Sequence, residues 1–171
     1  MKKNAFWLFL LAIQSFGAPD ADAQQRKFFA VTGAVEKKMT LTADSLERFP
    51  MRKIDSVVIL NHLGQRKSTL KNLEVVRLRD VLSRSVIPVE SPKQLNEFYF
   101  VCIASDGYKA VFSWNELFNN PLGDSIFIIV RRDGKVSGEL PEGIAVISPT
   151  DTMNGRRYIK NLEKISVRRA E

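Results

Sequence analysis

The sequence predicts an α+β fold in which layered, mixed β-sheet is joined by a few short helices. Apolar, β-rich runs recur along the chain with turn residues between them, and the helical patterns that separate them are few and short. No internal repeat, low-complexity segment or linker interrupts the pattern. Residues 24–171 are therefore expected to form one domain, long enough to bury its own core.

The first 23 residues predict a secretory signal peptide. Lys2 and Lys3 precede an apolar run over residues 5–16, and Ala21-Asp22-Ala23 fits the small-x-small cleavage pattern. The run is too short to span a membrane. We therefore expect a periplasmic or secreted protein, cleaved after Ala23, with no membrane span after cleavage.

Strands are expected at residues 28–35, 54–60, 98–104, 109–112, 125–132, 143–148 and 158–167. Asp106-Gly107 marks a turn between the third and fourth of these. Asp133-Gly134 follows the apolar run 127–130 and predicts a type I′ hairpin turn.

Three short helices are expected, beginning at Thr42, near Leu78 and at Ser113. Thr42 is a suitable N-cap, and Pro50 limits that helix to less than two turns. Leu78, Val81 and Leu82 have helical spacing. Ser113 and Glu116 form a capping box, which places a helix over residues 113–119.

The chain carries a formal net charge of +7, and its basic residues are spread along the sequence in pairs. No basic helix or aromatic-interleaved ribonucleoprotein motif accompanies them. Nucleic acid is therefore not expected as a partner, and most of the charge is expected on a solvated surface.

Several enzyme classes lack their motifs here. His62 is the only histidine, and no Gly-x-Ser-x-Gly elbow, phosphate-binding Walker loop, Gly-x-Gly-x-x-Gly or EF-hand occurs. Zinc sites normally use several His or Cys ligands at short spacing, so no metal site and no catalytic residue is predicted. Cys102, the only cysteine, lies among aromatic and β-branched residues at 98–104 and is expected to pack in the core.

The order of several weak motifs resembles a known family. A helix with Leu78, Asp80 and Leu82 is followed by Ser105-Asp106-Gly107-Tyr108, a hairpin, and the terminal segment PTDTMNGRRYIKNLEKISV. The chain from about residue 28 to 168 is similar to the oxidoreductase molybdopterin-binding domain, shared by sulfite oxidase and the catalytic subunit of the periplasmic methionine-sulfoxide reductase.

The resemblance implies a sulfite-oxidase-like fold and a pterin cofactor, molybdopterin or a relative, whose phosphate is held near Gly155, Arg156 and Arg157. A glycine lets backbone approach an anion, and two arginines supply forked donors. Asp106 and Tyr108 are expected at the pocket edge. The alternative is a solvated arginine pair at the start of an edge strand near Tyr158.

Two departures from the family limit the expected chemistry. Residues 61–70, where the family places its molybdenum-ligating cysteine, contain none; His62 lies there and is included among the candidate cofactor-binding residues. Ala145 stands where the family often has an arginine. We therefore expect an exported protein that binds a pterin or another small anion without a cysteine-ligated molybdenum. An oxidoreductase whose metal is held only by the pterin dithiolene, and a non-catalytic partner-binding module, remain as alternatives.

Overall fold

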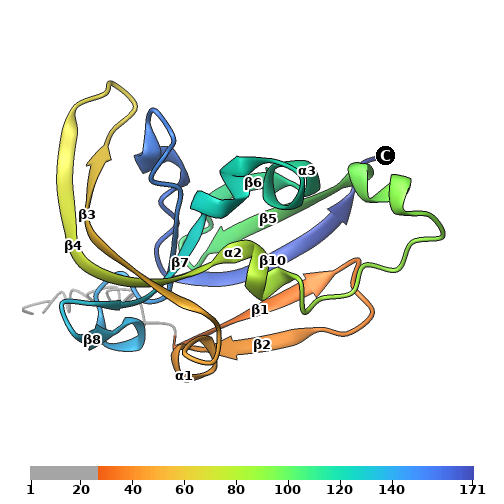
Figure 1. Cartoon of the computed structure of the whole chain (residues 1–171), viewed down its shortest axis with the longest axis horizontal. Helices are drawn as coiled ribbons and strands as arrows, with labels where there is room; N and C mark the ends of the chain where they lie inside the picture. The colour runs from red at the N-terminus through yellow and green to blue at the C-terminus, as the bar shows by residue number, and fades with distance from the viewer. Residues whose placement is uncertain (1–26) are drawn as a thin grey trace, which may run out of the picture.

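The computed structural model describes residues 27–171, so the expected leader and its cleavage site lie outside the described residues. Two five-stranded sheets form the framework (Figure 1). The first sheet has the order β2-β1-β10-β5-β6. Its strands are β1 (Phe28–Gly33), β2 (Met39–Thr42), β5 (Phe98–Ala104), β6 (Lys109–Ser113) and β10 (Leu162–Arg169). Only β1 and β10 are parallel, so the sheet is mixed as expected.

The second sheet has the order β3-β4-β7-β8, and β9 pairs with residues 127–129 of β7 on the side away from β4, beside β8. Its strands are β3 (Met51–Leu60), β4 (Arg66–Arg77), β7 (Phe127–Arg132), β8 (Lys135–Val136) and β9 (Ala145–Ile147). At the β7–β8 turn both Asp133 and Gly134 have positive φ, 50° and 78°, as a type I′ turn requires. The predicted α+β class is confirmed.

The short helices are α1 (Ala43–Leu46), α2 (Leu78–Leu82) and α3 (Trp114–Phe118). Thr42 and Ser113 are the N-caps of the first and third, as predicted; the capping box expected at Ser113 is present, and Thr42 forms one as well, with Ser45. Four 3₁₀ turns lie between the strands: η1 (Pro92–Glu97), η2 (Pro121–Ser125), η3 (Ser137–Glu139) and η4 (Asn154–Arg157). No helix within residues 27–171 combines the length and the apolarity needed to cross a membrane.

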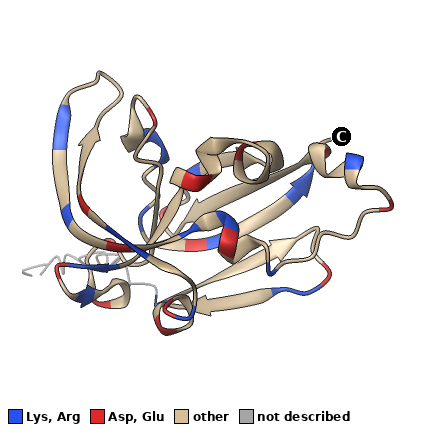
Figure 2. Ribbon diagram, viewed as in Figure 1, with Lys and Arg blue, Asp and Glu red and all other residues tan. Residues whose placement is uncertain are grey.

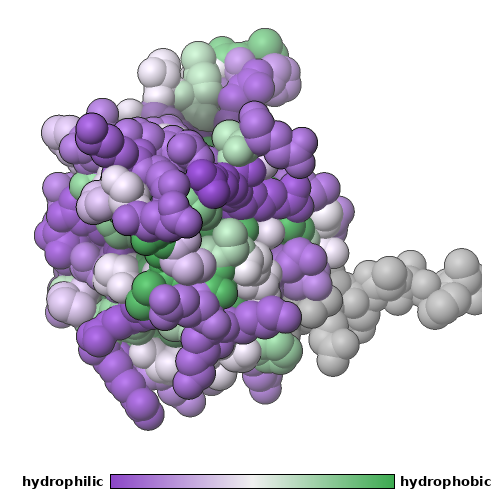
Figure 3. All heavy atoms as spheres, turned by 90° about the vertical axis from the view of Figure 1, so that its right-hand side faces the viewer, coloured by the Kyte–Doolittle hydropathy of each residue, from purple (hydrophilic) through white to green (hydrophobic). Residues whose placement is uncertain are grey.

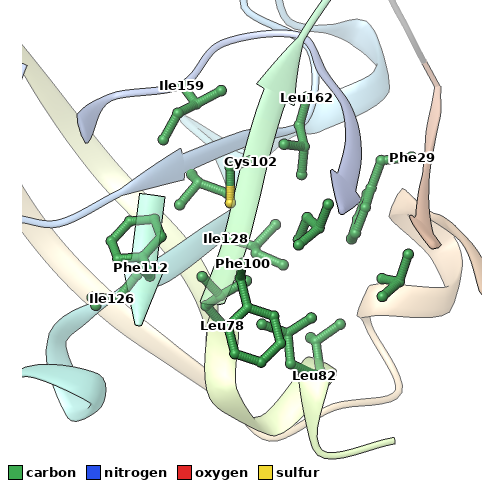
Figure 4. Packing of buried hydrophobic residues seen from close by; sticks show 14 of the residues in the cluster. Phe29, Leu78, Leu82, Phe100, Cys102, Phe112, Ile126, Ile128, Ile159 and Leu162 are labelled. Carbon is green, nitrogen blue, oxygen red and sulfur yellow. The ribbon is translucent and has the colours of Figure 1, made fainter. Parts of the chain in front are cut away.

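The main core lies where the inner faces of the two sheets meet. Phe29, Phe100 and Ile165 of the first sheet and Ile128 of the second are all within 1 % of complete burial. Figure 4 shows Cys102 among the buried hydrophobic side chains of this core, which also includes Ile128 and Ile159. The packing stabilises the layered arrangement because burying each large aliphatic or aromatic side chain contributes about 1.5–3 kcal/mol.

A second, smaller cluster lies on the other face of the second sheet. Ile59 and Leu70 of the β3–β4 hairpin pack there with Ile129 and Ile147. Because β7 contributes Ile128 to one cluster and Ile129 to the other, it is buried on both faces, which explains its continuous apolar run. The hairpin extends beyond this cluster and forms one wall of the site described below.

Three features of the structure differ from the expectations. The prediction missed β2 and the 12-residue β4, whose first half is hydrophilic. The last strand begins at Leu162 rather than at Tyr158, because Asn161 adopts a positive φ of 47° and only Ile159 bridges to Val146. The arginine pair therefore lies in η4, and β10 is central in its sheet, between β1 and β5, rather than an edge strand.

An apolar hollow of about 280 Å³ lies on a different part of the surface, bordered by α2, the segment 83–95, β5 and α3. Its aromatic lining includes Phe100, Trp114 and Phe118, and the last two rings stack at 5.4 Å. Figure 3 views the molecule from the side on which residues 83–97 lie and shows hydrophobic residues recessed between hydrophilic ones. None of the described residues that line this hollow is charged, so its chemistry differs from that of the predicted anion site.

Candidate functional site

A pocket of about 430 Å³ opens between the β3–β4 hairpin and residues 155–160. In Figure 1 the latter belong to the blue segment that rises beside the hairpin. The lining residues are Ile59, Leu60, Asn61, His62, Lys67, Ser68, Tyr108, Gly155, Arg156, Tyr158 and Lys160. Of the six predicted binding residues, the pocket brings together His62, Tyr108, Gly155 and Arg156; Asp106 and Arg157 do not line it.

Asp106 acts on the pocket indirectly, through the turn before β6. Its Oδ1 accepts a hydrogen bond from the backbone N–H of Tyr108 at 2.9 Å, and Gly107 has a φ of +84°. An aspartate that bonds the backbone two residues ahead forms a local Asx turn. The Tyr108 hydroxyl donates a hydrogen bond to the carbonyl of Arg156 at 2.5 Å and so joins the turn to η4.

Asn154 anchors η4 to the outer edge of β3. The side chain is 4 % exposed; its Nδ2 donates to the Val58 carbonyl at 2.8 Å, and its Oδ1 accepts from the Leu60 N–H at 2.9 Å. A side-chain amide here satisfies an edge-strand donor and acceptor that a neighbouring strand would otherwise bond. The pocket wall at residues 155–156 is therefore fixed to the hairpin.

Gly155 is required by this close approach of two backbones. A Cβ added there would lie 2.4 Å from the carbonyl oxygen of Leu60, closer than real Cβ atoms come to oxygen. The glycine was predicted to admit an anion to the backbone. In the structure its missing side chain instead lets the backbone of β3 pack closely at Leu60, and both residues line the pocket.

Arg157 is committed to internal contacts. Its Nε and Nη2 donate to Asp151 Oδ2 and Oδ1 at 2.5 and 2.6 Å, and its Nη1 donates to Glu116 Oε1 at 3.0 Å. The guanidinium also lies 4.7 Å from the ring centre of Phe112. Arg157 was expected to offer a second free guanidinium to an anion. Instead it links η4 to the first turn of α3 and is a positioning residue.

The pKa values of this pair reflect the contact. Partial burial alone would raise the pKa of Asp151, but hydrogen bonds from Arg157 and Ser148 and the charge of Arg157 outweigh it, so the pKa lies below its ordinary value. The hydrogen bond to Asp151 raises the pKa of Arg157, against the opposing effect of burial. Both groups therefore stay charged throughout the neutral range.

The pocket itself carries an excess of basic groups. Lys67, Arg156 and Lys160 line it with the imidazole of His62, and no carboxylate of residues 27–171 does. Within residues 27–171 no ion pair involves these three cations, although Lys160 lies 5.2 Å from the ring centre of Tyr158. Figure 2 shows basic positions on β4 and on the neighbouring segment that contains η4. Such a surface favours an anion.

Further polar residues line the pocket without having been predicted as binding residues, among them Lys67, Ser68, Tyr158 and Lys160. A β-bulge accounts for Lys67: Ile59 pairs with Ser68 and Leu60 with Arg66, so Lys67 is the extra residue of β4. Bulges re-aim side chains, which explains how two successive residues both line the pocket. Burial, together with the charge of Glu142, raises the pKa of Tyr158, so its hydroxyl stays protonated.

Cys102 does not belong to the pocket. It is 0 % exposed on β5, between Ala110 of β6 and Ile165 of β10, and burial raises the pKa of its thiol to about 12. A neutral, enclosed thiol is neither a nucleophile nor a ready metal ligand. Within residues 27–171 no group of three or more His, Cys, Asp or Glu side chains is arranged to hold a metal ion.

Comparison with known proteins supports the fold. No protein-family description matches the sequence, and no curated protein matches it significantly. Among solved structures, the chain is similar to the sulfane dehydrogenase SoxCD from Paracoccus pantotrophus, with a TM-score of 0.59 and 15 % sequence identity. The match covers 84 % of this chain and 38 % of the SoxCD chain. The chain therefore shares a distant molybdopterin-oxidoreductase-like fold, in agreement with the sulfite-oxidase-like architecture predicted from the sequence.

Proposed function

We propose that the protein binds a small anionic ligand of the pterin monophosphate class in the pocket between the β3–β4 hairpin and residues 155–160. The observation that carries the proposal is the convergence of Lys67, Arg156 and Lys160, with no carboxylate among the described residues that line the pocket. A pocket of about 430 Å³ has the size usual for small-molecule sites. The fold-level likeness to a molybdenum-cofactor enzyme supports a pterin as the organic part.

The pocket residues fit the two chemical parts of such a ligand. Lys and Arg side chains suit a phosphate, the lysines as point charges and Arg156 as a forked donor. Tyr108 and Tyr158 supply aromatic surface for a planar heterocycle, and Tyr108 is 45 % exposed. The roles are binding and orientation: the basic groups hold the phosphate, and the Tyr108–Arg156 hydrogen bond fixes the pocket wall.

The chain does not fit the thiolate ligation of molybdenum. Its only cysteine is in the core, and residues 61–70, which form the hairpin tip and the start of β4, contain none. A metal bound with the pterin would take its sulfur ligands from the pterin. We accordingly propose a binding role and assign no redox step to residues of this chain.

Equilibrium titration of a pterin monophosphate tests the proposal. Arg156→Ala and Lys67→Ala should each weaken binding by about tenfold, since one charge-assisted contact contributes about 1.5–3 kcal/mol and these contacts are partly solvated. Lys93→Ala, which removes the same charge from an exposed position in η1, is the matched control. Equal affinities in the native protein and all three variants would refute the site.

Export is the second part of the proposal, and it rests on the N-terminal Lys-Lys, apolar run and Ala-x-Ala pattern. The ligand would then be met, or retained, outside the cytoplasm. One cysteine cannot form an internal disulfide, so the chain depends on packing for its stability even in an oxidising compartment.

A further inference from the structure

A second hollow adjoins the proposed pterin site. Its volume is about 420 Å³, and its lining residues are Ser68, Thr69, Leu70, Lys71, Arg132, Asp133, Glu142, Tyr158 and Lys160. Three of them, Ser68, Tyr158 and Lys160, also line the first pocket. The two hollows therefore meet along a shared wall, and together they form one groove with two chambers.

The second chamber lies along an edge of β4 beside which the described part of the chain places no strand. β7 pairs with β4 only from Leu73 to Arg77, while β3 occupies the other side. Within residues 27–171 no strand pairs with residues 66–72 on the β7 side. Residues 68–71 line the chamber at this edge, and a strand edge without a neighbour presents hydrogen-bonding groups to a ligand.

The charges of the second chamber also favour an anion. Its two carboxylates already have partners: Glu142 is paired with Arg132 and is 6 % exposed, and Asp133 Oδ1 accepts from the Asn72 amide at 2.7 Å. Lys71 and Lys160 have no ion pair within residues 27–171. A ligand group in this chamber therefore meets two available ammonium groups and carboxylates that are already bonded.

We propose that the groove takes an elongated ligand with two anionic groups, one between Lys67 and Arg156 in the first chamber and one at Lys71 in the second, with Lys160 between them. The inference rests on the proposed anion site and extends the ligand class beyond a monophosphate, to a molecule with a di- or triphosphate chain or a comparable spacing of two anions. A monophosphate would occupy the first chamber and leave Lys71 without a contact.

Inorganic phosphate and tripolyphosphate separate the two chambers. Lys67→Ala should lower the affinity for both anions by about tenfold. Lys71→Ala should lower the affinity for tripolyphosphate by about five- to tenfold and leave the affinity for phosphate unchanged. Lys93→Ala has the same net charge as either variant, so it reveals any effect of overall charge alone. Moderate salt suppresses long-range attraction and leaves the direct contacts.

A second readout locates the ligand without mutation. Tripolyphosphate should protect Lys71 from amine acetylation, measured by mass spectrometry, and phosphate should not. If Lys71→Ala leaves tripolyphosphate binding unchanged while Lys67→Ala weakens it, the two-chamber inference is wrong and the single anion site stands. If neither anion is bound by the native protein, both the anion site and the two-chamber inference fall.

Discussion

Replacing Arg157 with alanine should destabilise the fold, and the contacts of Arg157 give the magnitude. The change removes a bidentate contact to Asp151, one hydrogen bond to Glu116 and the ring contact with Phe112. The side chains of Arg157 and Asp151 are only 20 % and 16 % exposed, so Asp151 would be left as a partly buried carboxylate that keeps the hydrogen bond from the Ser148 hydroxyl but loses its cationic partner. We expect the free energy of unfolding to fall by about 2–4 kcal/mol.

Thermal unfolding followed by circular dichroism measures this loss. For a domain of this size, about 2–4 kcal/mol corresponds to a melting temperature roughly 5–15 °C lower. Arg131→Ala is the matched control: Arg131 also pairs with a glutamate, Glu47, but the two side chains are 33 % and 35 % exposed, so the loss should be under about 1 kcal/mol. Arg157→Lys keeps the positive charge but not the bidentate guanidinium, so its melting temperature should lie between those of Arg157→Ala and Arg131→Ala. An unchanged melting temperature together with weakened anion binding would show that Arg157 is a ligand, and our assignment of it as a positioning residue would be wrong.

Three further predictions follow from burial, backbone approach and charge, and one from the leader. Cys102 should resist thiol reagents in the native protein and react after denaturation, since its thiol is fully buried; rapid native labelling would contradict its core position. Gly155→Ala should cost about 1–3 kcal/mol and weaken anion binding, whereas Gly138→Ala, whose methyl group would meet only a side chain at 3.7 Å, should be near neutral. Because the pKa of Asp151 is lowered in the folded protein, the ionised carboxylate stabilises the fold; this stabilisation is complete above pH 3.8, the ordinary pKa, and is lost as the pH falls through the folded pKa. Asp151→Asn should therefore make the free energy of unfolding depend less on pH below about pH 4, and an unchanged dependence would refute this. The intact mass of the exported protein should be that of a chain that begins at Gln24, and a mass that includes residues 1–23 would contradict cleavage.

Local signals in the sequence predict much of the fold. The Asp133-Gly134 pair and the preceding apolar run locate the β7–β8 hairpin, and Ser113 with Glu116 locates α3. The first half of β4 escapes such reasoning because Arg-Lys-Ser-Thr has no apolar alternation. It is a strand because β3 pairs with it over its whole length, which is a long-range effect of packing rather than of propensity.

The site is harder to predict because its contacts join distant parts of the chain. The Tyr108 hydroxyl and the Arg156 carbonyl are 48 residues apart in sequence, and Arg157 reaches Glu116 across 41. Family resemblance indicated residues 155–157, but adjacent arginines in a 3₁₀ turn point in different directions, so one lines the pocket and the other ties the turn down. The position of Lys67 depends on a bulge that no local motif announces.

The structure of the protein in complex with a pterin monophosphate, determined by crystallography, tests the central claim most directly. We predict that the phosphate lies within hydrogen-bonding distance of Lys67, Arg156 or Lys160, with the heterocycle against Tyr108 or Tyr158, while Arg157 keeps its contacts to Asp151. Ligand density in the apolar hollow beside Trp114, or an empty basic pocket at saturating ligand, would contradict the account.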